Sequence, residues 1–205
     1  MRTPALLAAA ALLAAAPALA QTQQQRALGT QSQTGSPPPT DPASPAAGLG
    51  STATRGDALA AAGFVRAAAT SDLYEMEASR LAEQRSQNAE VKRFAQHMLR
   101  DHGKTTNELK GMLPQLQGVS AQQMATSLDR QHQALLEQLQ GVQGAEFDRA
   151  FARQQVQSHQ AAVDLFRAYA QSGDDARLKQ WASQTLPSLD EHLREAQQLQ
   201  RATQG

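Results

Sequence analysis

The sequence predicts an all-α protein, and three observations support this prediction. Apolar residues recur with the 3.6-residue period of amphipathic helices from residue 57 to the end of the chain. Aromatic residues make up only 4% of the sequence, and the alternating segments and turn clusters typical of strands are missing from this region of sequence. Helix-capping residues also stand where the periodic segments begin. We therefore predict one helical domain over residues 57–205.

The first 56 residues are predicted to lie outside this domain. Residues 1–20 have the pattern of a secretory signal peptide, with Arg2, a short apolar run and an A-x-A cleavage sequence that ends at Ala20. Residues 21–56 are rich in Gln, Ser, Pro and Thr, so we expect a disordered linker. Cleavage after Ala20 would give a periplasmic or secreted protein.

The charge and cysteine content exclude several classes of function. Without Arg2, 18 of the 19 basic residues remain against 19 acidic ones, so the mature chain has no basic field for nucleic acid. No apolar run after residue 20 is long enough to cross a membrane. The chain has no cysteine, which excludes disulfides, thiolate metal sites and a lipoprotein anchor. The identity of any protein partner stays open.

The helical period predicts five helices, over residues 58–86, 89–116, 121–140, 145–172 and 174–202. Asp57 and Asn88 are expected to cap the first two helices, and Ser120 with Gln123 forms a capping box for the third. Gly173 is expected to end the fourth. The first two helices and the last two would form antiparallel hairpins, joined by a crossover helix about 30 Å long. This is the ferritin-like four-helix bundle.

Three residues inside these helices disfavour a regular helix. Gly63 and Gly103 each weaken a helix by about 1 kcal/mol relative to alanine. Neither glycine has a capping context, so we expect both to be tolerated. Pro187 is expected on the outer side of the last helix, where a kink would bend that helix around the core.

Four polar residues fall on the apolar faces of the helices, one on each bundle helix: Glu75, His102, His159 and His192. Counting residues from the turns predicts that Glu75 faces His102 and that His159 and His192 lie within about one turn of the same height. His97 is expected to be solvated and His132 to lie in the core. Asp101 would orient His102 or cap a neighbouring group, and Asp148 would favour a helix N-terminus.

Four blocks of sequence resemble one bacterial family, known as domain of unknown function 4142, whose members are often labelled predicted outer membrane proteins. The blocks are Glu75 to Glu77, Val91 to His102, Phe147 to Phe151 with His159, and Leu186 to Leu193. They occur in order over residues 60–203. The resemblance implies a secreted, ferritin-like helical protein without an assigned activity.

The four inward polar residues support more than one function. Carboxylate and imidazole suit iron, manganese or zinc, so Glu75, His102, His159 and His192 are candidate ligands of a mononuclear or atypical metal site. A di-iron centre needs Glu-x-x-His on two helices, whereas Leu99, Val156 and Leu189 precede these histidines by three residues. The incomplete ligand set favours a non-enzymatic protein with a structural Glu/His cluster. A helical adaptor or chaperone of the cell envelope is the third alternative.

Overall fold

The helical period of the sequence corresponds to regular helix over most of the described chain. The computed structural model describes residues 55–204, and every regular element in that range is helical, which confirms the all-α class. The predicted signal peptide and almost all of the predicted linker lie outside the described residues. The α-helices are α1 (Arg55–Leu59), α2 (Ala61–Arg85), α3 (Ala89–Met112), α4 (Arg130–Gln140), α5 (Gly144–Ser172) and α6 (Ala176–Thr203), and the 3-10 helices are η1 (Leu113–Gln115) and η2 (Ala121–Gln123).

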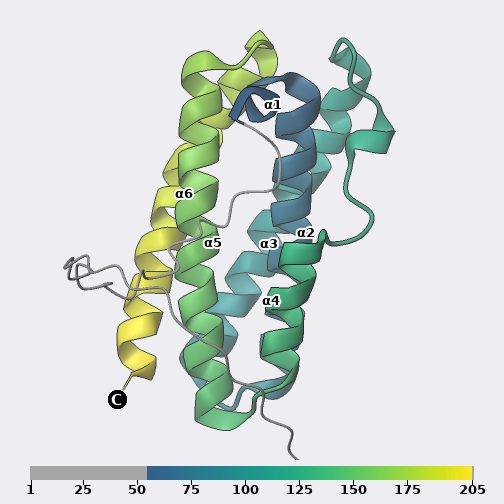
Figure 1. Cartoon of the computed structure of the whole chain (residues 1–205). Helices are drawn as coiled ribbons and strands as arrows, with labels where there is room; N and C mark the ends of the chain where they lie inside the picture. The colour runs from purple at the N-terminus through teal and green to yellow at the C-terminus, as the bar shows by residue number, and fades with distance from the viewer. Residues whose placement is uncertain (1–54, 205) are drawn as a thin grey trace, which may run out of the picture. The chain divides into compact units, whose positions relative to one another are not determined.

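Four long helices, α2, α3, α5 and α6, run side by side (Figure 1). Short turns join α2 to α3 and α5 to α6, and each of these pairs packs along its length as a hairpin. Because α2 also contacts α5 and α3 contacts α6, the two hairpins share one interior. None of the helices in residues 55–204 is both long enough and apolar enough to cross a membrane.

The first long helix begins differently from the prediction. Asp57 lies inside α1 and is not the N-cap of α2. The first backbone N–H of α2, that of Ala61, donates instead to Oδ1 of Asp174 at 2.8 Å. Asp174 lies in the α5–α6 turn, and Asp175, the next residue, caps α6. A distant aspartate therefore satisfies the start of α2, which sequence spacing could not indicate.

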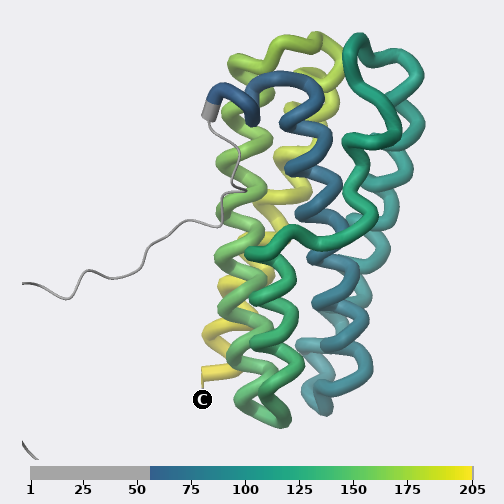
Figure 2. Tube along the Cα trace, turned by 45° about the vertical axis from the view of Figure 1, so that its right-hand side comes forward, coloured from purple at the N-terminus to yellow at the C-terminus, as the bar shows by residue number. Residues whose placement is uncertain are grey.

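The predicted crossover helix over 121–140 is wrong in its first half. Ser120 N–H donates to Oε1 of Gln123 at 2.7 Å, so the predicted capping box forms, but it opens only η2. Residues 124–129 are not helical, and the chain restarts as α4, where the Asp129 carboxylate accepts the His132 N–H at 2.9 Å. A strong N-cap at Asp129 favours a new helix over a continuous one. Figure 2 shows this connection running from the end of α3 to α4.

Gly63 lies inside α2, so the helix tolerates this glycine as expected, and Gly63 also has a packing role. A Cβ atom at Gly63 would lie 1.8 Å from the backbone oxygen of Asp57, because α1 folds back against the first turn of α2. Only glycine permits this approach. Gly103 lies inside α3, also as expected, and a Cβ atom there would meet no atom within 4 Å. Pro187 lies inside α6 on its exposed face, the side predicted.

Candidate metal site

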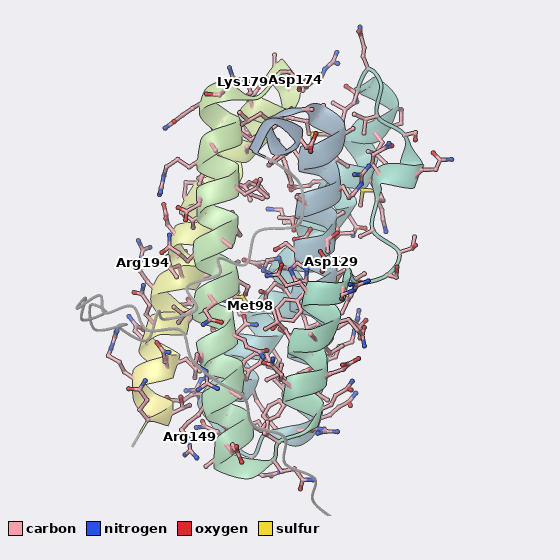
Figure 3. All side chains as sticks on the ribbon, viewed as in Figure 1. Met98, Asp129, Arg149, Asp174, Lys179 and Arg194 are labelled. Atoms are coloured by element: carbon pink, nitrogen blue, oxygen red, sulfur yellow. The ribbon has the colours of Figure 1, made fainter. Side chains whose placement is uncertain are left out.

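A layer of buried polar side chains divides the interior into two hydrophobic clusters. One cluster surrounds Phe64 and Trp181, and the other surrounds Tyr74 and Phe147. Met98, labelled in Figure 3, belongs to the second cluster and lies one helical turn before the layer on α3. Every long helix contributes to the layer, and the exposed fractions are Asp72 7%, Glu75 1%, His102 4%, His159 1% and His192 3%. Burying five polar groups at one level is unfavourable unless each is paired or binds a ligand.

His102, on α3, is held by a carboxylate from α2. Its Nδ1 lies 2.8 Å from Oδ1 of Asp72. The other carboxylate oxygen of Asp72 accepts the hydroxyl hydrogens of Thr105 at 2.8 Å and Thr106 at 3.0 Å. The carboxylate accepts from Nδ1–H, so the proton of the neutral ring lies on Nδ1. The buried Nε2 of His102 has no hydrogen-bond partner.

His159, on α5, is oriented by its own helix. Its Nδ1 lies 2.9 Å from the backbone oxygen of Gln155, one turn earlier. A carbonyl oxygen can only accept, so Nδ1 carries the hydrogen and Nε2 carries a lone pair. That Nε2 atom is buried and has no partner.

In His192, on α6, the unpaired nitrogen is Nδ1, whereas in His102 and His159 it is Nε2. Its Nε2 lies 3.0 Å from Oδ2 of Asp101, the residue that precedes His102 on α3. The contact with a carboxylate places the hydrogen on Nε2, which leaves a lone pair on Nδ1. Nδ1 of His192 is buried without a partner. Each of the three histidines thus has one anchored nitrogen and one free nitrogen.

The three histidine rings meet in the interior. The ring centroids of His159 and His192 are 5.3 Å apart, and each lies 5.6 Å from the centroid of His102. Each ring offers a nitrogen that lies within 4.8 Å of the nitrogens of the other two. Nitrogens bound to one tetrahedral ion at about 2.0–2.1 Å stand about 3.3 Å apart, so closing on a metal needs only side-chain adjustments. The arrangement can hold one metal ion.

The charges around the rings favour neutral imidazoles at two positions. Burial, together with the nearby His102 ring, lowers the pKa of His159 to about 3. Burial and the neighbouring histidines lower the pKa of His192 to about 4, against the opposing effect of Asp101. Burial also disfavours protonation of His102, but the Asp72 carboxylate outweighs it and raises the pKa of His102 above its usual value. The lowered pKa values of His159 and His192 keep the lone pairs of these two rings free for a metal at neutral pH.

Glu75 lies beside His159, on the side of the ring that faces Gln155. Its Oε1 is 4.0 Å from Nδ1 of His159 and accepts a short hydrogen bond from the hydroxyl of Ser158. Its Oε2 is buried without a partner. The partner of His102 is thus Asp72 and not Glu75, and the predicted pairing of Glu75 with His102 is corrected. Asp72 precedes Glu75 by three residues on the same helix face, so the helical period could have identified it.

Four other polar residues, His97, Asp101, His132 and Asp148, have partners that sequence spacing did not identify. His97 is only 28% exposed because its ring lies between Glu195, with Nδ1 at 3.0 Å, and Asp101, with Nε2 at 3.3 Å. Asp101 orients His192 and not His102. His132 is buried as predicted, and its Nδ1 lies 2.8 Å from Asp129. Asp148 is buried, and its Oδ1 accepts a hydrogen bond from the Ser86 hydroxyl, with 2.6 Å between the two oxygens. Asp148 therefore joins two segments in addition to the predicted favourable effect at a helix N-terminus.

A cavity of about 270 Å³ leads to the histidines between α3 and α6. His102 and His192 line it with Asp72 and Asp101, whereas the exposed side chains of Lys104, Gln184 and Ser188 line its outer part. Trp181 lines the same cavity, and its Nε1 donates to Oε2 of Glu108 at 3.0 Å. The cavity therefore extends from the surface to the sides of His102 and His192, whereas the unpaired ring nitrogens are buried behind it.

Comparison with known proteins supports the fold and the family. A solved structure, "CopM in the Cu(II)-bound form", superimposes with a TM-score of 0.59 at 19% sequence identity, and the match covers 70% of this chain and 97% of that one. At this identity the likeness concerns the fold. No curated protein sequence matches the chain. Residues 46–199 match the family described as "Domain of unknown function (DUF4142)", as the sequence blocks predict. The chain belongs to the DUF4142 family.

Proposed function

We propose that this protein binds a divalent transition-metal ion inside its helical domain through His102, His159 and His192. The observation that carries the proposal is that each histidine has one nitrogen anchored by a hydrogen bond and one buried nitrogen without a partner. Histidines that ligate metals generally donate their second N–H to a carboxylate or a carbonyl, as these three do. A purely structural cluster would instead be expected to pair its buried nitrogens with one another or with other groups.

The charges behind the histidines favour a divalent cation. A doubly charged ion bound by three neutral imidazoles keeps its full charge in a dry interior, which is unfavourable without nearby anions. Asp72 and Asp101 supply two carboxylates in direct contact with the ligating rings. Glu75 adds a third carboxylate, which contacts His159, and its free Oε2 makes it the candidate for a fourth ligand after a side-chain rotation.

The donor set points to copper or zinc ahead of manganese. Imidazole nitrogen suits zinc, copper, iron and nickel, whereas manganese prefers oxygen ligands. Among divalent ions of the first row, Cu²⁺ has the highest intrinsic affinity for such sites. The similar CopM structure is a Cu(II)-bound form, which gives independent support for testing copper first.

We further propose that the domain is ferritin-like and that it works in the bacterial cell envelope. The two hairpins joined by the long connection through α4 support the first statement. The signal-peptide pattern of residues 1–20 supports the second. The proposed role is binding of the ion, which a periplasmic protein could hold, buffer or deliver.

A metal titration of single-histidine variants tests the proposed function. Untagged protein is treated with chelator, then titrated with Cu(II) or Zn(II) against a chromophoric competitor. His102→Ala, His159→Ala and His192→Ala are each expected to weaken the inner ion by more than the 10–100-fold typical for a residue that only supports a ligand. His132→Ala, which removes a buried histidine outside the cluster, should leave the affinity unchanged. Equal affinity of wild type and His159→Ala, with unchanged helicity, would overturn the proposal.

A further inference from the structure

A second group of metal-ligating side chains lies next to the buried histidines, closer to the surface. His97, Asp101 and His192 each offer a ligand atom, and these atoms lie within 4.8 Å of one another. The exposed fractions of the His97 and Glu195 side chains are 28% and 36%, against 4% for His192. The group therefore spans the distance from solvent to the interior.

His97 is enclosed by carboxylates from two helices. Oε2 of Glu195, on α6, lies 3.0 Å from its Nδ1, and Oδ2 of Asp101, on α3, lies 3.3 Å from its Nε2. The same Asp101 oxygen accepts from Nε2 of His192 at 3.0 Å. One carboxylate oxygen of Asp101 therefore lies beside both imidazoles, and the Nε2–H of His192 points at it. A metal ion that displaces this proton would find one carboxylate and two imidazoles around it.

His192 is the residue that both groups share. Its Nδ1 faces the buried histidines and its Nε2 faces Asp101 and His97. Its ring centroid lies 5.1 Å from that of His97 and 5.3 Å from that of His159. The four histidines thus form a continuous series of rings from the surface to the interior.

A surface groove leads to the outer group. The groove has a volume of about 620 Å³ and runs between α3 and α6. His97 and Glu195 line it together with Glu90, Arg93 and Arg100, and Arg93 is paired with Glu90 at 3.7 Å. This groove is separate from the 270 Å³ cavity that reaches His102. His97 lines the groove but not that cavity.

We propose that Nε2 of His97, the Asp101 carboxylate and Nε2 of His192 form an outer site for a second divalent transition-metal ion, with Glu195 orienting His97 through its Nδ1. Nε2 of His192 carries a hydrogen, so binding there releases that proton to solvent, and with both ions bound His192 bridges them as an imidazolate. Solvent-exposed ligands bind and release ions faster than buried ones, so the outer site would receive an ion first. The shared His192 would then allow that ion to pass to the inner site. This inference rests on the proposed function and deepens it by adding a second site and a route of entry.

Equilibrium dialysis of the full chain against Zn(II) tests the outer site. Wild type is expected to bind two zinc ions, and His97→Gln and His159→Ala one each. Glu195→Gln should weaken the second ion at least 10-fold. Glu191→Gln, an exposed position one turn earlier on α6, is the matched control and should bind two ions. Circular dichroism of each variant checks that the helices are intact.

The number of zinc ions bound by wild type, His97→Gln and His159→Ala tests the inner site and the outer site separately. One ion that persists in His97→Gln and disappears in His159→Ala would overturn the outer site and leave the inner one. One ion that disappears in His97→Gln and persists in His159→Ala would support the outer site and overturn the inner one. No bound zinc in wild type would overturn both. Two ions that both persist in His97→Gln would also overturn the outer site.

Discussion

Oδ1 of Asp72 lies 2.8 Å from Nδ1 of His102, and this contact between α2 and α3 determines which nitrogen of the ring faces the interior. The contact is buried, with Asp72 7% and His102 4% exposed. Because Asp72 also accepts from Thr105 and Thr106, its carboxylate is fixed before any ligand arrives. A ligand that is positioned in advance loses less entropy when it binds.

Asp72→Asn should therefore weaken metal binding without removing a ligand. The amide cannot compensate the charge of a bound ion, and its NH₂ group can turn toward Nδ1 and favour the wrong tautomer. We expect affinity for Cu(II) or Zn(II) to fall by about 10–100-fold, measured by competition with a chromophoric chelator. Asp164→Asn changes a carboxylate that is 63% exposed on α5 and should have no effect. Equal affinities of the two variants would contradict this role for Asp72.

The metal-free protein should lose stability in mild acid. His159 and His192 have pKa values of about 3 and about 4 when folded, but about 6.5 when unfolded. Below pH 6.5 the unfolded chain binds protons that the folded chain cannot, so the free energy of unfolding falls as the pH decreases toward 4. Each group contributes up to about 1.4 kcal/mol per pH unit. The raised pKa of His102 acts in the opposite direction, since its stabilising contribution is complete below pH 6.5 and is lost at higher pH.

Urea unfolding in the presence of chelator between pH 4 and 7 measures this effect. His159→Leu removes one of the two depressed pKa values, so its free energy of unfolding should depend less steeply on pH than that of wild type. His132→Leu serves as the control for removal of a buried histidine. Parallel pH profiles for wild type and His159→Leu would show that His159 does not resist protonation in the folded protein.

Substitution of two helical glycines by alanine should have opposite effects. Gly63→Ala places a Cβ atom against the Asp57 carbonyl and should destabilise the protein by about 1–3 kcal/mol or detach α1. Gly103→Ala adds a methyl group in open space within α3 and should stabilise it by about 0.4–1 kcal/mol. Thermal unfolding followed by circular dichroism compares the two. A Gly63→Ala protein as stable as wild type would mean that α1 does not pack against α2 in solution.

Asp174→Ala should destabilise the end of the domain that contains the α5–α6 turn. Oδ1 of Asp174 accepts from the Ala61 N–H at 2.8 Å and from the Tyr169 hydroxyl at 3.1 Å. Losing this cap should lower the free energy of unfolding by about 1–2 kcal/mol. Hydrogen exchange at the first turn of α2 should also become faster. Asp190→Ala, at a half-exposed position on α6, should change neither quantity.

The sequence was sufficient to predict the four long helices and which of their histidines are buried. His102, His159 and His192 interrupt regular apolar stripes, and the 3.6-residue period alone places them in the interior. The heights of the two histidines above the α5–α6 turn can be compared by counting residues. His159 is 13 residues before Ser172, the end of α5, and His192 is 16 residues after Ala176, the start of α6. This difference corresponds to about 4.5 Å of helix, which the packing of α5 on α6 accommodates.

The rest of the site depends on contacts between distant segments. Glu195 meets His97 although 98 residues separate them, and nothing local in either helix indicates the pair. The same is true of Asp174, which satisfies the start of α2 from 113 residues away. The non-helical start of the α4 connection was missed for a different reason. Ser120 and Asp129 are about equally good N-cap residues, so local propensity does not decide between one helix and two.

The most direct test of the buried site is X-ray absorption spectroscopy of the zinc-loaded protein, recorded on His97→Gln so that only the inner ion is present. The protein is loaded with one equivalent of Zn(II) and separated from free ion. We predict three imidazole nitrogens at about 2.0–2.1 Å from the metal, with a fourth oxygen ligand. His159→Ala should lose this spectrum. A first shell made only of oxygen, or a spectrum identical in His159→Ala, would contradict the proposal that the three histidines bind the ion.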